Sequence, residues 1–140
     1  MRKDDCIFCK LANGDIPTNS IYEDDDFKVI LDMAPAAKGH ALVLPKDHFD
    51  NIYDMDPEVL GKAVQVGQKV INNAKEALGC QGYNIVQNNG EVAGQTVFHF
   101  HMHLIPRYED MDNSSMLKWA PLEVSGDELK EIAEAIKVEK

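Results

Sequence analysis

Between residues 97 and 106, three histidines alternate with apolar residues, a pattern that fits a β-strand and not an α-helix. Successive side chains of a strand point to opposite faces, so His99, His101 and His103 are expected to share one face. A helix would spread the same imidazoles over more than half of its circumference. The apolar residues of the row would then face the core: Phe98, Phe100, Met102 and Leu104. The sequence therefore predicts a half-buried strand whose histidine face carries the chemistry.

The remaining hydrophobic pattern predicts further strands and one long helix. Short runs of β-branched and aliphatic residues predict strands at 27–31, 41–44 and 83–87, and a helical turn is expected at 6–12. Asp56 and Pro57 suit the N-cap and first position of a long helix. Apolar residues then recur at helical spacing until Gly79 ends the helix.

A second helix is predicted near the C-terminus, where Ser125 and Glu128 fit a capping box. Its apolar face would consist of Leu129, Ile132, Ala133 and Ile136. Strands with short connections, one long helix and a terminal helix favour an antiparallel sheet covered by helices, an α+β fold. We expect a single domain over 1–140, with a core at 1–107 and a C-terminal extension and helix at 108–140.

Charge and composition exclude several classes of function. Fourteen basic against 24 acidic residues give a formal net charge of −10, a field that repels polymeric phosphate and argues against a nucleic-acid partner. A small phosphorylated ligand needs only local donors. No run of about 18 apolar residues occurs, and the first residues lack a secretory signal, so we expect a cytoplasmic protein without a membrane partner. The G-x-G-x-x-G and G-x-x-x-x-G-K-[ST] motifs are absent, which excludes Rossmann and P-loop nucleotide sites.

The chain has three cysteines, an odd number that argues against a disulfide framework. Cys6 and Cys9 form a C-x-x-C pair, but no strand is expected before Cys6, so a thioredoxin-like redox role does not fit. Two thiolates at this spacing supply half of a tetrahedral zinc site, which His48 and His99 would complete. Two alternatives stay open: free thiols, and a catalytic zinc on all three histidines of the row, whose span of about 13 Å makes it awkward.

If His99 serves a metal, His101 and His103 remain for catalysis. A neutral imidazole is a nucleophile towards phosphorus near neutral pH. A neighbouring imidazole can bind a phosphoryl oxygen or protonate a leaving group. Donors of the kind that hold phosphate come just upstream, at Asn88, Gly90, Gly94, Gln95 and Thr96.

With these residues the sequence resembles the histidine triad (HIT) superfamily. The family motif is His-φ-His-φ-His-φ-φ, in which φ is apolar, and residues 99–105 fit every position. The resemblance extends over about 6–107 and is weaker over 108–140. The other stretches that resemble the family are 32–35, 38–40, 44–48, 88–90 and 94–97.

The resemblance implies an α+β homodimer with a five-stranded antiparallel sheet in each chain, the two sheets being joined into one. It also implies cleavage of the α-phosphate of purine nucleoside phosphoramidates or nucleotidyl adducts, through a nucleotidyl-histidine intermediate on His101. His103 would contact the phosphate and assist the leaving group, and His40 would orient the triad. The alternative functions are a dinucleoside polyphosphate hydrolase and a non-catalytic nucleotide-binding interaction module.

The family's nucleotide-binding positions correspond to residues of this sequence. Asp32 would bind the ribose hydroxyls. The base pocket would be lined by Phe8, Ile30 and Met33. The phosphate would be held by Asn88, Gly94, Gln95 and Thr96. Some bacterial-type members of the family are similar in having a structural zinc at the positions of Cys6, Cys9, His48 and His99, so we expect one structural zinc per chain.

Overall fold

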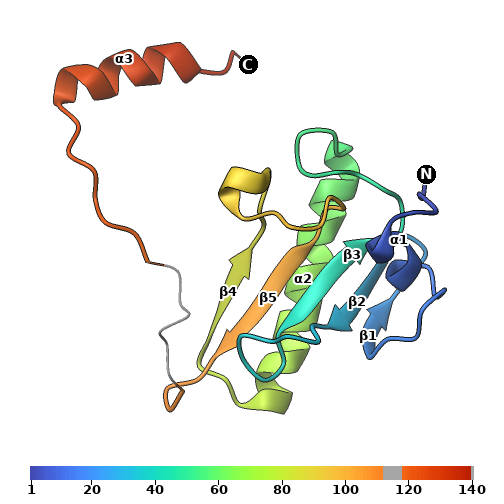
Figure 1. Cartoon of the computed structure of the whole chain (residues 1–140). Coiled ribbons are helices and arrows are strands. Elements are labelled where there is room, and N and C mark those ends of the chain that lie inside the picture. The colour runs from blue at the N-terminus through green and yellow to red at the C-terminus, as the bar shows by residue number, and fades with distance from the viewer. Residues whose placement is uncertain (112–117, 140) are drawn as a thin grey trace.

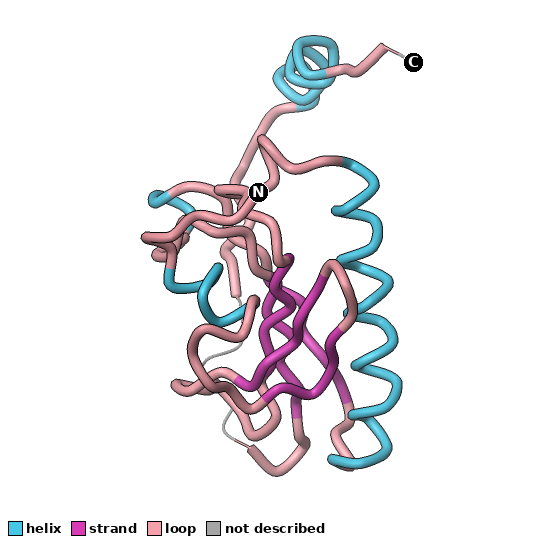
Figure 2. Tube along the Cα trace, turned by 90° about the vertical axis from the view of Figure 1, so that its right-hand side faces the viewer, coloured by secondary structure: helices cyan, strands magenta, loops and turns pink. Residues whose placement is uncertain are grey.

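A computed structural model describes residues 1–111 and 118–139 and contains a five-stranded antiparallel sheet between helices (Figure 1). The strands lie in the order β1-β2-β3-β5-β4. Their bounds are Ser20–Glu23 (β1), Phe27–Leu31 (β2), Ala41–Pro45 (β3), Gly82–Val86 (β4) and Met102–Arg107 (β5). The helix α1 (Ile7–Ala12) covers one face and α2 (Pro57–Leu78) the other, as Figure 2 shows from the side. The predicted α+β class and antiparallel sheet are confirmed.

The central strands supply two cores because their side chains alternate between the faces of the sheet. On the α2 side, Val29 of β2 and Val43 of β3 are fully buried in the larger core. On the α1 side, Ile30 of β2 and Leu42 of β3 pack beneath Phe8. The sheet thus has one face that serves mainly stability and a second that carries a smaller core beside the histidines.

The long helix α2 begins and ends as the sequence predicts. Asp56 is its N-cap, and a carboxylate oxygen of Asp56 accepts from the backbone N–H of Glu58 at 2.8 Å. Gly79 ends the helix in the left-handed conformation, with φ of 67°. The buried stripe that packs on β3 and β5 consists of Ala63, Val66, Gly67 and Val70.

The predicted strand over 97–106 is longer than the observed one, because β5 begins only at Met102. Regular pairing stops there: the ladder with β4 ends where Val86 lies opposite His103, and the ladder with β3 ends at the pair Val43–Met102. Before β5, the N–H of Phe100 still donates to the carbonyl of Phe49 at 2.7 Å.

The shared face of the three histidines is confirmed in spite of the shorter strand. Phe100 and Leu104 lie in the α2 core, and His99 and His101 lie on the α1 side of the sheet, near Phe8. The prediction for Phe98 is wrong, because its side chain is 46% exposed and lies outside both cores.

Two elements of the structure differ from the prediction or extend it. The short edge strand β1 was not among the predicted strands, and its register shifts between Ser20 and Tyr22, which breaks the period-2 pattern. The C-terminal helix α3 (Gly126–Ile136) begins as predicted, with Ser125 as its N-cap. Its predicted apolar face is exposed within the chain, and α3 lies away from the sheet (Figure 1). Among the described helices, none is both long and apolar enough to cross a membrane.

Two glycines of α2 should respond oppositely to substitution. A Cβ on Gly67 would lie 2.8 Å from Cε of Met102, so Gly67→Val should lower the free energy of unfolding by about 1–3 kcal/mol through overpacking. A Cβ on Gly61 meets nothing within 4 Å, so Gly61→Ala should raise it by about 0.5–1 kcal/mol through helix propensity. Urea denaturation of both variants tests this, and equal effects would contradict the close approach of α2 to β5.

Candidate functional site

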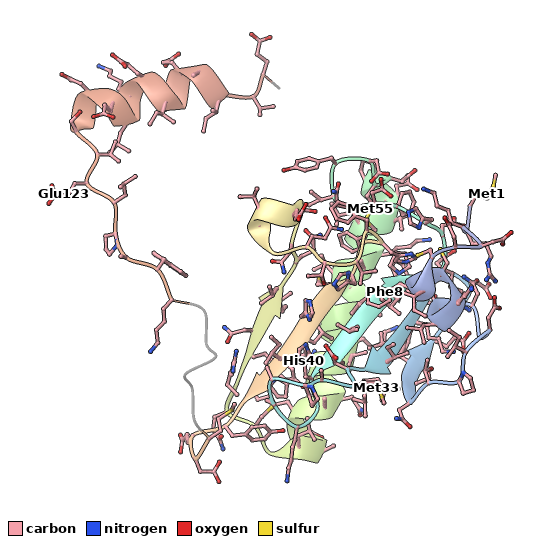
Figure 3. The ribbon with its side chains drawn as sticks, viewed as in Figure 1. Met1, Phe8, Met33, His40, Met55 and Glu123 are labelled. Atoms are coloured by element: carbon pink, nitrogen blue, oxygen red, sulfur yellow. The ribbon has the colours of Figure 1, made fainter. Side chains whose placement is uncertain are left out.

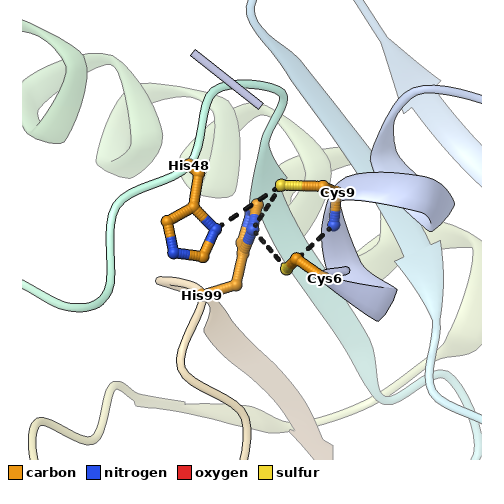
Figure 4. Close-up of side chains that lie close together, drawn as sticks. All are labelled: Cys6, Cys9, His48 and His99. Atoms are coloured by element: carbon orange, nitrogen blue, oxygen red, sulfur yellow. Dashed lines mark hydrogen bonds between the residues drawn. The ribbon is translucent and has the colours of Figure 1, made fainter. Parts of the chain in front are cut away.

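Two cysteines and two histidines converge on the α1 side of the sheet (Figure 4). Cys6 is the N-cap of α1, Cys9 lies in its first turn, His48 follows β3 and His99 precedes β5. The Nδ1 of His99 lies 3.4 Å from both sulfurs, and the Nδ1 of His48 lies 3.5 Å from the sulfur of Cys9. All four ligand atoms lie within 4.8 Å of one another, which is compatible with tetrahedral coordination of one ion.

The hydrogen bonds of these two imidazoles determine which nitrogen faces the sulfurs. The Nε2–H of His99 donates to the carbonyl of Pro45 at 2.9 Å, and the Nε2–H of His48 donates to a carboxylate oxygen of Asp50 at 2.7 Å. A neutral imidazole carries one N–H, so both Nδ1 atoms present lone pairs to the cysteines. A carbonyl or carboxylate behind a histidine is the arrangement that orients metal ligands. The donor set and its orientation therefore fit zinc.

Burial determines the protonation of this cluster. Burial lowers the pKa of His99 to about 4, so the imidazole is neutral near pH 7. Burial also raises the pKa of the Cys9 thiol, although the N–H of Lys3 donates to its sulfur at 3.3 Å and acts in the opposite direction. The imidazole of His99 is thus ready to bind a metal, whereas a thiolate at Cys9 needs a cation to offset its burial.

His101 lies beside the Cys–His cluster and is held in one tautomer. Its Nδ1–H donates to the backbone carbonyl of His99 at 2.8 Å, which leaves the lone pair on Nε2. Burial lowers the pKa of His101 below its ordinary value, although the His99 carbonyl and Asp32 act in the opposite direction. The imidazole packs edge-on against Phe8, with 4.9 Å between ring centroids. A neutral imidazole in a fixed orientation is what a nucleophile requires.

His40 and His103 form a directed pair of hydrogen bonds. The backbone N–H of Ala36 donates to Nδ1 of His40 at 3.0 Å, so the proton of His40 lies on Nε2. This Nε2–H donates to Nδ1 of His103 at 2.9 Å, and a carboxylate oxygen of Asp32 lies 3.5 Å from Nε2 of His40. His103 must therefore carry its own proton on Nε2. Burial lowers the pKa of His103 to about 4, with His101 and His40 adding to the shift, so this Nε2–H belongs to a neutral imidazole.

The same hydrogen bonds argue against a metal at Asp32, His40 and His103, although their ligand atoms lie within 4.8 Å of one another. A metal on Nε2 of His40 would move the proton to Nδ1. That proton would then face the N–H of Ala36, and two donors would oppose each other 3.0 Å apart. This second cluster therefore suits proton and hydrogen-bond chemistry, and the Cys–His cluster suits a metal.

A cleft of about 690 Å³ opens in front of the triad. Figure 3 labels two of the residues that line it, Phe8 on α1 and Met33 on the loop that joins β2 and β3. His40, labelled at the end of the same loop, is not among the lining residues. Most of the predicted nucleotide-binding residues line this cleft: Phe8, Ile30, Asp32, Met33, Asn88, Gly94, Thr96, His101 and His103. The structure thus gathers the residues predicted for base, ribose and phosphate, except Gln95, around one volume together with His101 and His103.

One predicted ligand lies elsewhere. Gln95 is 2% exposed and is not among the residues that line the cleft, because its side-chain amide bonds to backbone groups behind the loop. The side chain of Gln95 thus points away from the cleft, and a role of Gln95 in nucleotide binding stays a prediction.

Sequence reasoning also missed part of the cleft wall. Leu42 lines the cleft and faces the same way as Ile30, so the alternation within β3 was a usable signal. The loop between α1 and β1 contributes three residues for which no sequence pattern gave a signal: Pro17, Thr18 and Asn19.

The chain belongs to the HIT family: the model of the HIT domain matches residues 13–110. An adenosine 5′-monophosphoramidase of Schizosaccharomyces pombe is 37% identical to the chain over 131 residues, which are 94% of this chain and 95% of that protein. The resemblance inferred from the histidine motif is thereby confirmed.

Solved structures agree with the fold and include one with a metal. A HIT family protein from Bacillus anthracis matches with a TM-score of 0.86 at 40% identity, over 95% of each chain. A zinc-bound histidine triad family protein from Mycobacterium smegmatis matches with a TM-score of 0.72 at 36% identity, over 94% of this chain and 97% of that one.

The lowered pKa of His103 should make stability depend on pH. Between pH 6.5 and about 4 the unfolded chain binds a proton that the folded chain excludes, so the free energy of unfolding falls as the pH is lowered. At pH 5 we expect a contribution of about 1–2 kcal/mol relative to pH 7, allowing for the partial exposure of the ring. His103→Gln removes one of the titrating groups and should reduce this dependence, to which His99, with its own pKa of about 4, also contributes. Chemical denaturation at both pH values and equal metal content checks it, and parallel pH profiles would contradict it.

Proposed function

We propose that the protein is a nucleotidyl hydrolase or transferase that cleaves the α-phosphate of purine nucleoside phosphoramidates or nucleotidyl adducts. The observation that carries this proposal is the Nε2 lone pair of His101, which the hydrogen bond to the His99 carbonyl leaves free beside the cleft. The activity named for the fission-yeast relative supports a phosphoramidate as substrate. A binding module would need no nucleophile in a fixed tautomer.

The cleft offers separate subsites for the parts of a nucleotide. The base would lie against the apolar side chains of Phe8, Ile30 and Met33. The Asp32 carboxylate, oriented by the N–H of Ala34 at 2.9 Å, would accept hydrogen bonds from both ribose hydroxyls. The phosphate would lie against the remaining subsite, which consists of Asn88, Gly94 and Thr96.

In the proposed first step, Nε2 of His101 attacks the α-phosphorus. The P–N bond to the leaving group breaks, its electron pair stays on the leaving nitrogen, and a solvent proton completes the amine. The Nε2–H of His103 stabilises the charge that develops on the phosphoryl oxygen or leaving nitrogen. His40 acts on His103, because its Nε2–H bond holds the donor tautomer of that imidazole.

In the proposed second step, water attacks the nucleotidyl-histidine. The P–Nε2 bond breaks, its electron pair returns to His101, and a proton of the water is released to solvent. The Nδ1–H bond to the His99 carbonyl persists throughout, so His101 is regenerated in the tautomer with which it began.

We further propose that the chain binds one structural zinc ion at Cys6, Cys9, His48 and His99. The metal would supply charge neutralisation for the buried thiolates and would join α1 to the segments around His48 and His99. The zinc-bound relative from Mycobacterium smegmatis supports this proposal. Catalysis in this proposal is by imidazole and involves no metal.

A homodimer is proposed for the same fold. β4 lies at one edge of the sheet, and Ile85 on it is 52% exposed. The side chains of Trp119, Leu129 and Ile136 are also exposed within the chain. Pairing of two β4 edges and burial of the C-terminal apolar residues by a second copy would remove these exposed surfaces from water. Sedimentation analysis tests this proposal, and a monomer at micromolar concentration would contradict it.

Replacement of the nucleophile tests the enzymatic proposal. His101→Ala should lower AMP release from an adenosine phosphoramidate by at least about 10³-fold, and His103→Ala, which removes one donor, by about 10²-fold. Gln68→Met, on the exposed surface of α2, is the control.

Intact-mass analysis of quenched reactions should find a nucleotidyl adduct on the wild-type protein and none on His101→Ala. A parallel assay with diadenosine polyphosphates, with and without magnesium, separates the two hydrolase classes. Wild-type protein without turnover, or undiminished turnover of His101→Ala, would refute the proposal.

Removal of one thiol tests the structural zinc. Cys6→Ser should lower bound zinc well below one ion per chain, and the lost stabilisation is about 4 kcal/mol when free zinc exceeds the dissociation constant about a thousandfold. Turnover of the still-folded variant at low temperature should persist. The control is Cys80→Ala, which changes a buried cysteine outside the cluster. Elemental analysis and thermal denaturation provide the measurements, and retained zinc with chelator-sensitive turnover would instead indicate a catalytic metal.

A further inference from the structure

The buried amide of Gln95 lies behind the loop that would hold phosphate. Its two sequence neighbours, Gly94 and Thr96, line the cleft, whereas Gln95 does not. A buried primary amide is costly unless all of its hydrogen-bonding groups are satisfied.

Both ends of the amide are engaged. The oxygen accepts from the backbone N–H of Gly90 at 2.8 Å and from the side-chain nitrogen of Asn51 at 3.3 Å. The nitrogen donates to the carbonyls of Asp50 at 2.6 Å and Val97 at 3.1 Å. The backbone N–H of Gln95 also donates to the carbonyl of Gly90 at 3.1 Å, so Gln95 binds both polar groups of Gly90.

The loop between β4 and β5 needs such a tie. Gly90 and Gly94 have φ angles of 96° and 99°, which other residues rarely adopt. Glycine adopts these angles at no steric cost, but it adopts many other backbone conformations equally well. The conformation of the loop is thus not enforced by the glycines themselves. Groups that contact phosphate bind it well only when they are held in place before the ligand arrives.

The anchor on the far side belongs to the segment that carries His48. In this segment the backbone carbonyl of Asp50 accepts from Gln95, and the carboxylate of Asp50 accepts from His48. The N–H of Ile52 adds a parallel link to the side-chain oxygen of Asn89 at 2.8 Å. A hydrogen-bonded segment next to the Cys–His cluster therefore supports the loop that faces the cleft.

We propose that Gln95 is a positioning residue, whose amide fixes the loop 88–96 against the His48–Asp50 segment in the conformation that binds the nucleotide phosphate. This inference rests on the nucleotide-binding function proposed above. It assigns to Gln95 no contact with substrate.

The test compares Gln95→Met, which keeps the length of the side chain and loses all four hydrogen bonds, with Gln68→Met on the surface of α2. Dissociation constants for AMP and adenosine are measured by calorimetry, and exchange of the Gly90 and Gly94 amides is measured by NMR in the ligand-free protein. Gln95→Met should weaken AMP binding by about 10- to 100-fold and adenosine binding by less than about 3-fold. Both loop amides should exchange faster than in Gln68→Met.

A conservative variant supplies a second signature. Gln95→Glu places a carboxylate against two carbonyl oxygens, and protonation at lower pH restores one donor. The ratio of its AMP affinity to that of the wild type should therefore rise as the pH falls from 8 to 5.5. A ratio that does not change with pH would count against the proposal.

Three outcomes with Gln95→Met also overturn the inference. Unchanged AMP affinity in Gln95→Met would remove any role in phosphate binding. Weaker AMP binding with unchanged amide exchange would make Gln95 a direct ligand. Equal losses of AMP and adenosine affinity would indicate general destabilisation. If the wild type binds no AMP, the proposed function fails, and the amide exchange alone decides whether Gln95 holds the loop.

Discussion

One fully buried imidazole, His99, connects the two halves of the candidate site. Its Nδ1 lies 3.4 Å from both cysteine sulfurs, its Nε2–H donates to Pro45 at the end of β3, and its backbone carbonyl accepts from His101. The side chain is 0% exposed. Any movement of His99 would disturb the ligand set of the proposed metal and the tautomer of the proposed nucleophile together. The metal centre and the catalytic centre are therefore mechanically one unit, even though the chemistry proposed for them is separate.

Backbone groups decide which cluster suits which chemistry. Pro45 presents a carbonyl to its histidine, so that imidazole must donate there and keeps a lone pair for a metal. Ala36 presents an N–H to His40, so that imidazole must accept there and donates from its other nitrogen to His103. Residue types alone would allow a metal at both clusters. The backbone N–H of Ala36, which points at Nδ1 of His40, excludes a metal at the cluster of Asp32, His40 and His103.

The sequence predicted the residues of the site better than their roles. The alternation around His101 placed the triad on one face, and the caps at Asp56 and Gly79 located α2, because these signals are local. The start of β5 and the edge strand β1 were not predictable in this way, since both depend on where neighbouring strands stop pairing. The place of Gln95 was not predictable for a related reason: composition identifies an amide as a donor, but only the fold shows on which side of the loop that amide lies.

The proposed phosphate site works without formal positive charge. Among the described residues that line the cleft, none is a lysine or arginine, and burial lowers the pKa values of His40, His101 and His103 so that all three are neutral near pH 7. In a chain of net charge −10, an anionic substrate must then be held by dipoles: backbone and side-chain amides, a hydroxyl and imidazole N–H groups. The interaction of an anion with a dipole depends on direction as well as distance, whereas its interaction with a full charge depends on distance alone. A dipole that is turned away from the anion therefore no longer stabilises it. A neutral site of this kind depends on buried residues that fix direction, which is the part that His99 plays for the triad and that we assign to Gln95 for the loop.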